Sequence, residues 1–341
     1  MRRLLAPAVL LVAVAAVGRA DPPTADELQA WIRDLDSPAF RTRDESARKL
    51  RLAGADAAPA LAKATKTGGA EVADRALKLL GDMAEGKDPK AEAAARRQLR
   101  RLADGESRAA ADARLLLNRK RNQLLAQMLF AGVAYDEEDG RVSRIDLDNS
   151  NDVPTVVPLL KEFPELETLS ASTGRFTDAQ AGHLADLPNL RYLNLYRSNI
   201  GDEGLKHLTG LKNLRWLPMG HSRVTDNGLK VISWMTQLEY VGVRGDKVTD
   251  AGLVHLKGLT NLTGLYLGET KVTDDGLEHL AGLTKLQTLY LHTTGITDAG
   301  LEHLKDLKDL RVLYLTRTKT TAAGRARLKE AIPDLRIPDV E

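Results

Sequence analysis

The chain has 341 residues, of which 43% are apolar and 28% are charged, and its formal net charge at pH 7 is +2. This length is sufficient for two domains. The near-neutral charge argues against binding to nucleic acid through overall electrostatics. The chain contains no cysteine, which excludes disulfide bonds and a thiol nucleophile.

The first twenty residues have the pattern of a secretory signal peptide. Two arginines precede an apolar run, Leu4–Val17, and small residues occupy positions 18 and 20, ahead of a predicted cleavage site. The run is shorter than the roughly 20 residues that cross a bilayer, so we expect cleavage rather than a retained membrane anchor. No later segment is apolar enough to span a membrane. The sequence therefore predicts export, to the periplasm or the extracellular space.

Residues 21–130 are rich in Ala, Arg and Leu and predict an all-α domain. Ser37 and Pro38 are typical of an N-cap and first helical turn, which predicts a helix to about Leu52. Asp88–Pro89 predicts the start of another helix. Further helices are expected over Ala57–Lys66, Glu71–Met83 and Glu106–Phe130. The run R-T-R-D-E-S-A-R-K-L-R-L-A-G-A-D-A-A-P-A-L resembles a HEAT-type helical repeat. The acidic segment within residues 131–141 is expected to be a linker.

A unit of 24 residues repeats without insertion or deletion through residues 142–309, and a degraded eighth unit begins at Leu310. The clearest copy, Leu262–Lys285, reads L-T-G-L-Y-L-G-E-T-K-V-T-D-D-G-L-E-H-L-A-G-L-T-K. Apolar residues at unit positions 1, 4 and 6 predict a short strand, and those at positions 16, 19 and 22 predict a helix packed on it. A fixed period of this length is typical of a solenoid.

The repeat resembles the leucine-rich repeat family, in the variant that carries T-D-x-G-L. The resemblance covers residues 142–341 in about eight units, and it implies an α/β solenoid with parallel strands on the concave face and helices on the convex face. The family generally supplies recognition surfaces, so the resemblance also implies a binding function.

Two polar columns of the repeat are interpreted as structural. A Thr-Asp pair, such as Thr273-Asp274, recurs in almost every unit just before the predicted helix, where its side chains could accept backbone N–H groups of the first helical turn. Its recurrence argues against catalysis, which needs a carboxylate pair once. Histidine occupies position 18 of five units, but a straight column lacks the convergent ligands of a metal site. We therefore expect no metal and no cofactor.

The strongest candidate site is the concave face of the sheet. If positions 4 and 6 point inward, positions 3, 5 and 7 point outward and position 8 lies at the rim. Six of the seven tyrosines fall on these outward positions, and Tyr, Trp and Arg are enriched at binding hot spots. The predicted ligand-binding residues are Tyr192, Tyr196, Arg197, Trp216, His221, Tyr240, Arg244, Tyr266, Tyr290, His292, Tyr314 and Arg317. Packing of aromatic side chains across strands is the alternative interpretation of this pattern.

These observations predict a non-catalytic scaffold that binds a protein or peptide outside the cytoplasm. Recognition of carbohydrate by the exposed aromatic residues is the alternative. An enzyme is disfavoured because the sequence contains no G-x-S-x-G, no glycine-rich phosphate loop and no H-E-x-x-H. No nucleic-acid partner is expected, and the sequence leaves the oligomeric state open.

Overall fold

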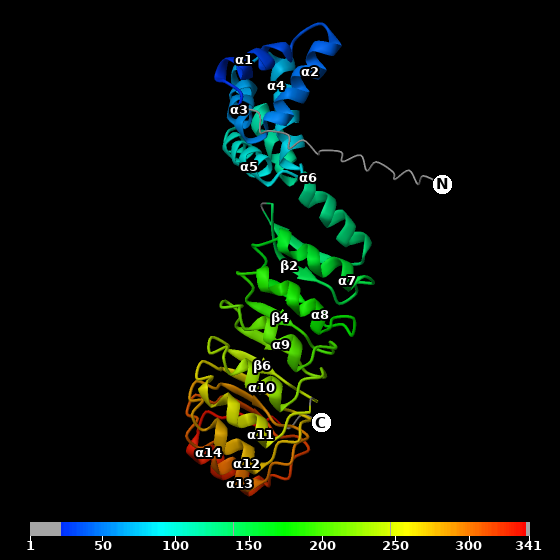
Figure 1. Ribbon diagram of the computed structural model, residues 1–341. Helices are drawn as coiled ribbons and strands as arrows, with labels where there is room; N and C mark the ends of the chain where they lie inside the picture. Colours follow the sequence, from blue (N-terminus) through cyan, green and yellow to red (C-terminus); the bar gives the residue numbers. More distant parts are fainter. Residues whose placement is uncertain (1–21, 139, 246, 339–341) are drawn as a thin grey trace, which may run out of the picture. The chain divides into compact units, whose positions relative to one another are not determined.

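The computed structural model describes residues 22–138, 140–245 and 247–338. The predicted signal peptide lies outside the described residues. The chain divides into two compact units, one ending at Gln123 and the other beginning at Leu124 (Figure 1). Within the described residues, every helix is too short or too polar to cross a bilayer.

The first unit is all-α, as predicted. Its elements are α1 (Ala25–Asp34), α2 (Phe40–Ala53), the 3₁₀ turn η1 (Gly54–Asp56), α3 (Ala58–Thr67), α4 (Ala70–Ala84), α5 (Pro89–Ala103) and most of α6 (Arg108–Phe130). Asp88 caps α5 by accepting a hydrogen bond from the backbone N–H of Lys90, as its position before a proline predicts. Fully buried leucines such as Leu50, Leu61 and Leu80 form the core between the helices.

The predicted start of α2 is wrong by about two residues. The Ser37 hydroxyl accepts a hydrogen bond from the Ala39 backbone N–H at 3.3 Å, which stabilises a turn instead of a helical cap. Ala39 then has extended backbone angles and precedes the first helical residue, Phe40. The Arg43 guanidinium contacts the carbonyl oxygens of Ser37 and Pro38 and fixes this turn.

The segment 131–141, expected to be a linker, is part of the second unit. It contains strand β1 (Ala134–Glu138), which pairs antiparallel with β2 (Arg141–Asp146). Just before it, Leu125 and Met128 on the last turns of α6 are buried in the core of the second unit. The exposed acidic side chains of this segment, which led to the prediction of a linker, are also typical of an edge strand, because charges there oppose pairing with another chain.

The predicted stacking of strands is confirmed. Strands β3 (Thr168–Ser170), β4 (Tyr192–Asn194), β5 (Trp216–Pro218), β6 (Tyr240–Gly242), β7 (Gly264–Tyr266), β8 (Thr288–Tyr290) and β9 (Val312–Tyr314) follow β2 in one parallel sheet, in sequence order. The paired residues of neighbouring parallel strands are 24 positions apart in the sequence, as Tyr266 and Tyr290 are, and Tyr290 and Tyr314. This constant register brings every column of the sequence repeat into a line across the sheet.

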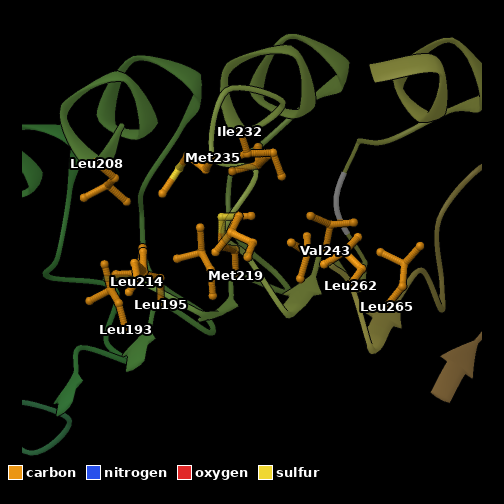
Figure 2. Packing of buried hydrophobic residues seen from close by; sticks show 14 of the residues in the cluster. Leu193, Leu195, Leu208, Leu214, Met219, Ile232, Met235, Val243, Leu262 and Leu265 are labelled. Carbon is orange, nitrogen blue, oxygen red and sulfur yellow. The ribbon is translucent and has the colours of Figure 1, made fainter. Parts of the chain in front are cut away.

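Short helical segments return the chain from each strand to the next and cover one face of the sheet (Figure 1). They are α7 (Val153–Val156), η2 (Val157–Glu162), α8 (Asp178–Ala181), η3 (Gly182–Asp186), α9 (Asp202–Leu208), α10 (Asp226–Ile232), α11 (Asp250–Leu253), η4 (Val254–Gly258), α12 (Asp274–Leu277), η5 (Glu278–Leu280), α13 (Asp298–Glu302) and α14 (Ala322–Ala331). Inward side chains such as Leu193, Leu208 and Leu265 fill the space between strands and helices and have no exposed surface (Figure 2).

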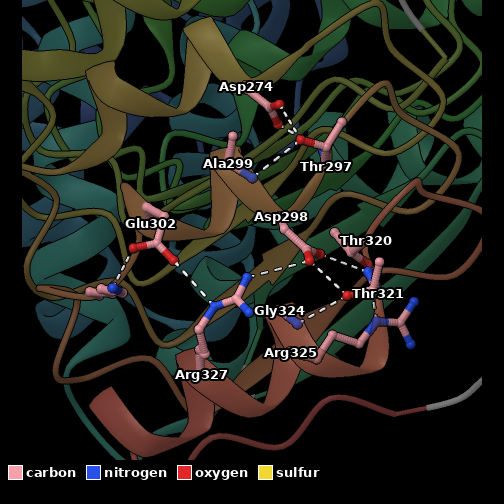
Figure 3. Close-up of polar contacts among 11 residues, drawn as sticks. Asp274, Thr297, Asp298, Ala299, Glu302, Thr320, Thr321, Gly324, Arg325 and Arg327 are labelled. Atoms are coloured by element: carbon pink, nitrogen blue, oxygen red, sulfur yellow. Dashed lines mark hydrogen bonds and ion pairs between the residues drawn. The ribbon is translucent and has the colours of Figure 1, made fainter.

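The Thr-Asp column is structural, but its aspartates act between units instead of within their own helices. Most of the threonines cap their own helices, as Thr297 does by accepting a hydrogen bond from the Ala299 backbone N–H. Thr273 makes no such bond. The aspartate reaches the next unit, where its two oxygens accept the backbone N–H at 2.7–2.8 Å and the hydroxyl of the threonine at 2.6–2.7 Å, as Asp274 does with Thr297 (Figure 3). Asp178 accepts only the backbone N–H of the next unit, at 2.6 Å, because Gly201 stands there in place of a threonine. We call these six aspartates (Asp178, Asp202, Asp226, Asp250, Asp274 and Asp298) the aspartate ladder.

The glycine at unit position 15 makes room for this ladder. A Cβ at Gly204 or Gly228 would lie 2.5 Å from a carboxylate oxygen of the aspartate in the preceding unit, and the equivalent glycines of later units are at least as crowded. The spacing T-D-x-G thus encodes contact between neighbouring units, with the glycine of one unit accommodating the carboxylate of the unit before it.

Candidate functional site

The predicted ligand-binding side chains lie on the side of the sheet that the helices leave uncovered. We call this surface, formed by unit positions 3, 5, 7 and 8 of strands β4–β9 and the residues that follow them, the open sheet face. Trp216 is 41% exposed there, whereas the neighbouring Leu217 in the same strand has no exposed surface. The alternation of inward leucines and outward aromatic residues therefore has the predicted direction.

One aromatic cluster lies on strands β4–β6. The Trp216 and Tyr240 rings are stacked, with centroids 5.5 Å apart and an angle of 13° between their planes. Tyr192 pairs with Trp216 in the adjacent strand. Tyr240 lies across Gly264, where a Cβ would come within 2.6 Å of its ring, and burial raises the pKa of the Tyr240 hydroxyl. The missing side chain of Gly264 on β7 therefore provides the space that holds Tyr240 of the preceding strand.

The second cluster is a ladder of three tyrosines on β7–β9, which we call the tyrosine ladder. Tyr266 and Tyr290 have ring centroids 4.3 Å apart, and Tyr290 and Tyr314 are 4.4 Å apart with nearly parallel planes at 4°. Burial is the main cause that raises the pKa of the Tyr266 and Tyr290 hydroxyls. The rings therefore cover one another's faces and present their edges to solvent.

A charged cluster joins the two groups of aromatic residues. The Glu269 Oε1 atom accepts hydrogen bonds from Arg244 Nη2 at 2.6 Å and Nε at 3.1 Å. The Nε2 atoms of His221 and His292 lie 3.7 and 3.8 Å from the same carboxylate. Hydrogen bonding from Arg244 is the main cause that lowers the pKa of Glu269 and, reciprocally, raises the pKa of Arg244. Glu269 is absent from the predicted site, although its position at the rim of the sheet could have indicated it.

The tyrosine ladder and the charged cluster border one pocket of about 480 Å³. The residues that line it are Arg244, Tyr266, Glu269, Tyr290, His292, Thr293, Tyr314, Thr316 and Arg317. Six of them were predicted from the sequence, whereas Tyr192, Tyr196, Arg197, Trp216, His221 and Tyr240 lie outside the pocket. The open sheet face thus comprises a pocket near its C-terminal end and an aromatic surface on β4–β6 that lies outside the pocket.

Residues at unit position 8 have a left-handed backbone that favours glycine. Arg197, His221, Glu269, Thr293 and Arg317 have φ between 56° and 61°, and glycine occupies the equivalent position only at 245 among units three to eight. A left-handed conformation is costly for side chains with a Cβ and most costly for a β-branched residue. Because the conformation recurs in each of units three to eight, it belongs to the turn that ends every strand.

We expect Thr293→Gly to increase stability. Removing the Cβ relieves left-handed strain of about 1–3 kcal/mol, which exceeds the roughly 0.5–1 kcal/mol by which glycine favours the unfolded chain. Thr288→Gly, at a strand position with ordinary backbone angles, is the control and is expected to lower stability. Urea unfolding followed by circular dichroism measures both changes. A less stable Thr293→Gly variant would contradict the assignment of strain.

The His292 imidazole is expected to titrate below the usual range of histidine. Burial is the main cause that lowers the pKa of His292, the Arg244 charge lowers it further, and Glu269 opposes both. Arg244→Gln removes the repulsive charge and frees the Glu269 carboxylate to attract a proton, so the pKa of His292 should rise. An NMR titration of the imidazole Cε1–H resonance measures this shift, and a pKa that falls or stays constant would contradict the described cluster.

Residues 186–208 match the family model described as leucine-rich repeat, and the chain has the strand and helix arrangement that this resemblance implies. No curated protein matches the sequence. Among solved structures, an internalin (inlF) from Listeria monocytogenes is 21% identical, with a TM-score of 0.41 over 53% of this chain and 56% of that one. The chain thus spans little more than half the length of that internalin.

Two further solved structures are similar over part of the chain. Internalin C2 from Listeria monocytogenes is 21% identical, with a TM-score of 0.46 over 59% of this chain and 82% of that one. The leucine-rich repeat ectodomain of the Arabidopsis thaliana receptor kinase GASSHO1/SCHENGEN3, solved with CASPARIAN STRIP INTEGRITY FACTOR 2, is 14% identical, with a TM-score of 0.41 over 64% of this chain and 29% of that one.

Proposed function

We propose that the protein is a non-catalytic scaffold that binds a protein or peptide through the open sheet face, outside the cytoplasm. The observation that carries this proposal is the concentration of aromatic side chains. Aromatic residues are only 4% of the chain, yet six of its seven tyrosines lie on this one surface. Tyrosine, tryptophan and arginine are enriched among the few residues that carry most of the binding energy at protein interfaces, and the two aromatic residues combine a large apolar area with a polar group.

The mutual packing of the rings favours a protein over a carbohydrate. Sugar recognition by aromatic residues uses the exposed face of a ring. In the tyrosine ladder the central ring, Tyr290, is covered by neighbouring rings at 4.3 and 4.4 Å. Its accessible edge and hydroxyl suit hydrogen bonds to a peptide backbone and contacts with apolar side chains. Trp216, at 41% exposure, is the residue that favours carbohydrate as the second candidate ligand.

The placement outside the cytoplasm rests on the sequence of the first twenty residues, with their positive start, apolar run and small residues before position 21. Expression of the full chain with a C-terminal tag, followed by fractionation and N-terminal sequencing, tests it. We expect the tagged protein in the exported fraction with an N-terminus at Asp21. A tagged protein that remains in the cytoplasm with its first residues intact would contradict this part of the proposal.

The proposed ligand class is tested by presenting the purified protein to a glycan array and to a random peptide display library in parallel. We expect enrichment of peptides whose binding saturates, and no saturable glycan signal. Saturable binding to a glycan together with no enriched peptide would replace the proposal with carbohydrate recognition. Trp234 is 77% exposed on the helical side. The Trp234→Ala variant is therefore the control for non-specific binding of peptides to an exposed aromatic side chain.

A further inference from the structure

The charges of the open sheet face differ in sign from those of the surrounding solenoid. Residues 131–341 contain 25 Lys and Arg against 30 Asp and Glu. Units three to eight nevertheless place three arginines and one glutamate at positions 3, 5, 7 and 8, namely Arg197, Arg244, Arg317 and Glu269. The candidate site is therefore a positive surface on an acidic body, which favours an anionic partner.

Only two of these three arginines retain an uncompensated charge. Arg244 and Glu269 neutralise one another at 2.6 Å. Arg197 is exposed and lies over the Tyr196 ring, with its guanidinium carbon 5.3 Å from the ring centroid. Arg317 is exposed at the end of the pocket, and no described acidic side chain forms an ion pair with it. Both arginines occupy unit position 8, with φ of 58° and 57°.

The regular stacking of strands fixes the separation of the two arginines. They lie five units apart, and neighbouring strands are about 4.8 Å apart, which gives a separation of about 24 Å along the sheet. An extended peptide advances about 3.3–3.6 Å per residue, so about seven residues span this distance. Between the arginines lie the aromatic clusters and the neutralised Arg244–Glu269 pair.

We propose that the partner presents an extended acidic segment that crosses strands β4–β9, with two carboxylates about seven residues apart that bind Arg197 and Arg317. The inference rests on the proposed function and specifies its partner. Apolar or aromatic residues of the segment between the two carboxylates contact Trp216, Tyr240 and the tyrosine ladder. The segment ends before β2 and β3, because the outward Asp146 and Asp148 of the first unit would repel it.

The test uses a display library of random twelve-residue peptides selected on the purified full chain. We expect enriched peptides to carry acidic residues about seven positions apart and to bind more weakly as salt rises. Arg197→Gln and Arg317→Gln should each reduce their affinity about tenfold, since a charge-assisted hydrogen bond is lost. Lys257→Gln, which removes one exposed positive charge on the helical side, is the matched control and should leave affinity unchanged.

The outcomes separate this inference from the proposed function. Enriched peptides that are neutral or basic would overturn the acidic segment and leave the proposed binding face in place. The same conclusion would follow if the peptides bound both arginine variants as tightly as the parent protein but bound Tyr192→Ala/Trp216→Ala more weakly. Peptides that bind this double variant as tightly as the parent would overturn both. Selection that enriches no peptide would also overturn the acidic segment, because the site would then not accept an extended chain.

Discussion

Gly252→Ala is expected to lower the free energy of unfolding by about 2 kcal/mol. The new Cβ would collide with Asp226 Oδ1 of the preceding unit and would lie 2.9 Å from Leu229 Cδ1. Asp226 would then lose its hydrogen bonds to the backbone N–H and hydroxyl of Thr249, so that two neighbouring units separate at this point. Urea unfolding measured by circular dichroism gives the change in stability.

The matched control is Gly258→Ala, six residues later in the same unit. A Cβ at Gly258 meets no other heavy atom within 4 Å, so stability should be unchanged or slightly increased by the reduced freedom of the unfolded chain. A double-mutant cycle with Asp226→Ala identifies the contact that matters. The two substitutions should couple by at least about 0.5 kcal/mol, because the alanine at 252 has no carboxylate to displace once Asp226 is removed. Additive effects would contradict the proposed role of the glycine column.

The second large effect is expected for binding. Tyr192→Ala combined with Trp216→Ala should reduce affinity for the partner at least about 30-fold, because truncation of a hot-spot residue costs about 2 kcal/mol or more. Stability should change little, since Leu193 and Leu217 retain their fully buried positions beneath these side chains. Trp234→Ala removes an equally large exposed aromatic residue from the helical side and should leave affinity unchanged. A folded double variant with the affinity of the parent protein would contradict the role of the aromatic surface.

Most of the fold could be predicted because one unit specifies it many times. Each copy repeats the alternation of the strand and the leucines of the helix, so the order of the strands and their register follow directly from the period of 24 residues. The direction of the outward tyrosines followed from the same alternation. By contrast, the start of α2 depends on a single local competition between a helical N-cap and a turn at Ser37. The turn forms, because the Ser37 hydroxyl accepts a hydrogen bond from the Ala39 backbone N–H.

Contacts between units were harder to predict than contacts within them. Because every unit is alike, an aspartate that binds its own helix and one that binds the next unit leave the same pattern in the sequence. The destination of Asp274 therefore became evident only with its bonds to Thr297. The role of Glu269 could also be recognised only from the three-dimensional structure, because its partners Arg244, His221 and His292 come from three different units.

The central claim, that the open sheet face holds the partner, is tested most directly by photo-crosslinking. A photoreactive phenylalanine analogue replaces Tyr290 in the pocket or Trp234 on the helical side, and both proteins are illuminated with the exported proteins of the source cell. We predict that position 290 captures a defined protein, that excess unmodified chain prevents this capture, and that position 234 does not capture it. Equal capture at both positions, or capture at 234 alone, would contradict the claim.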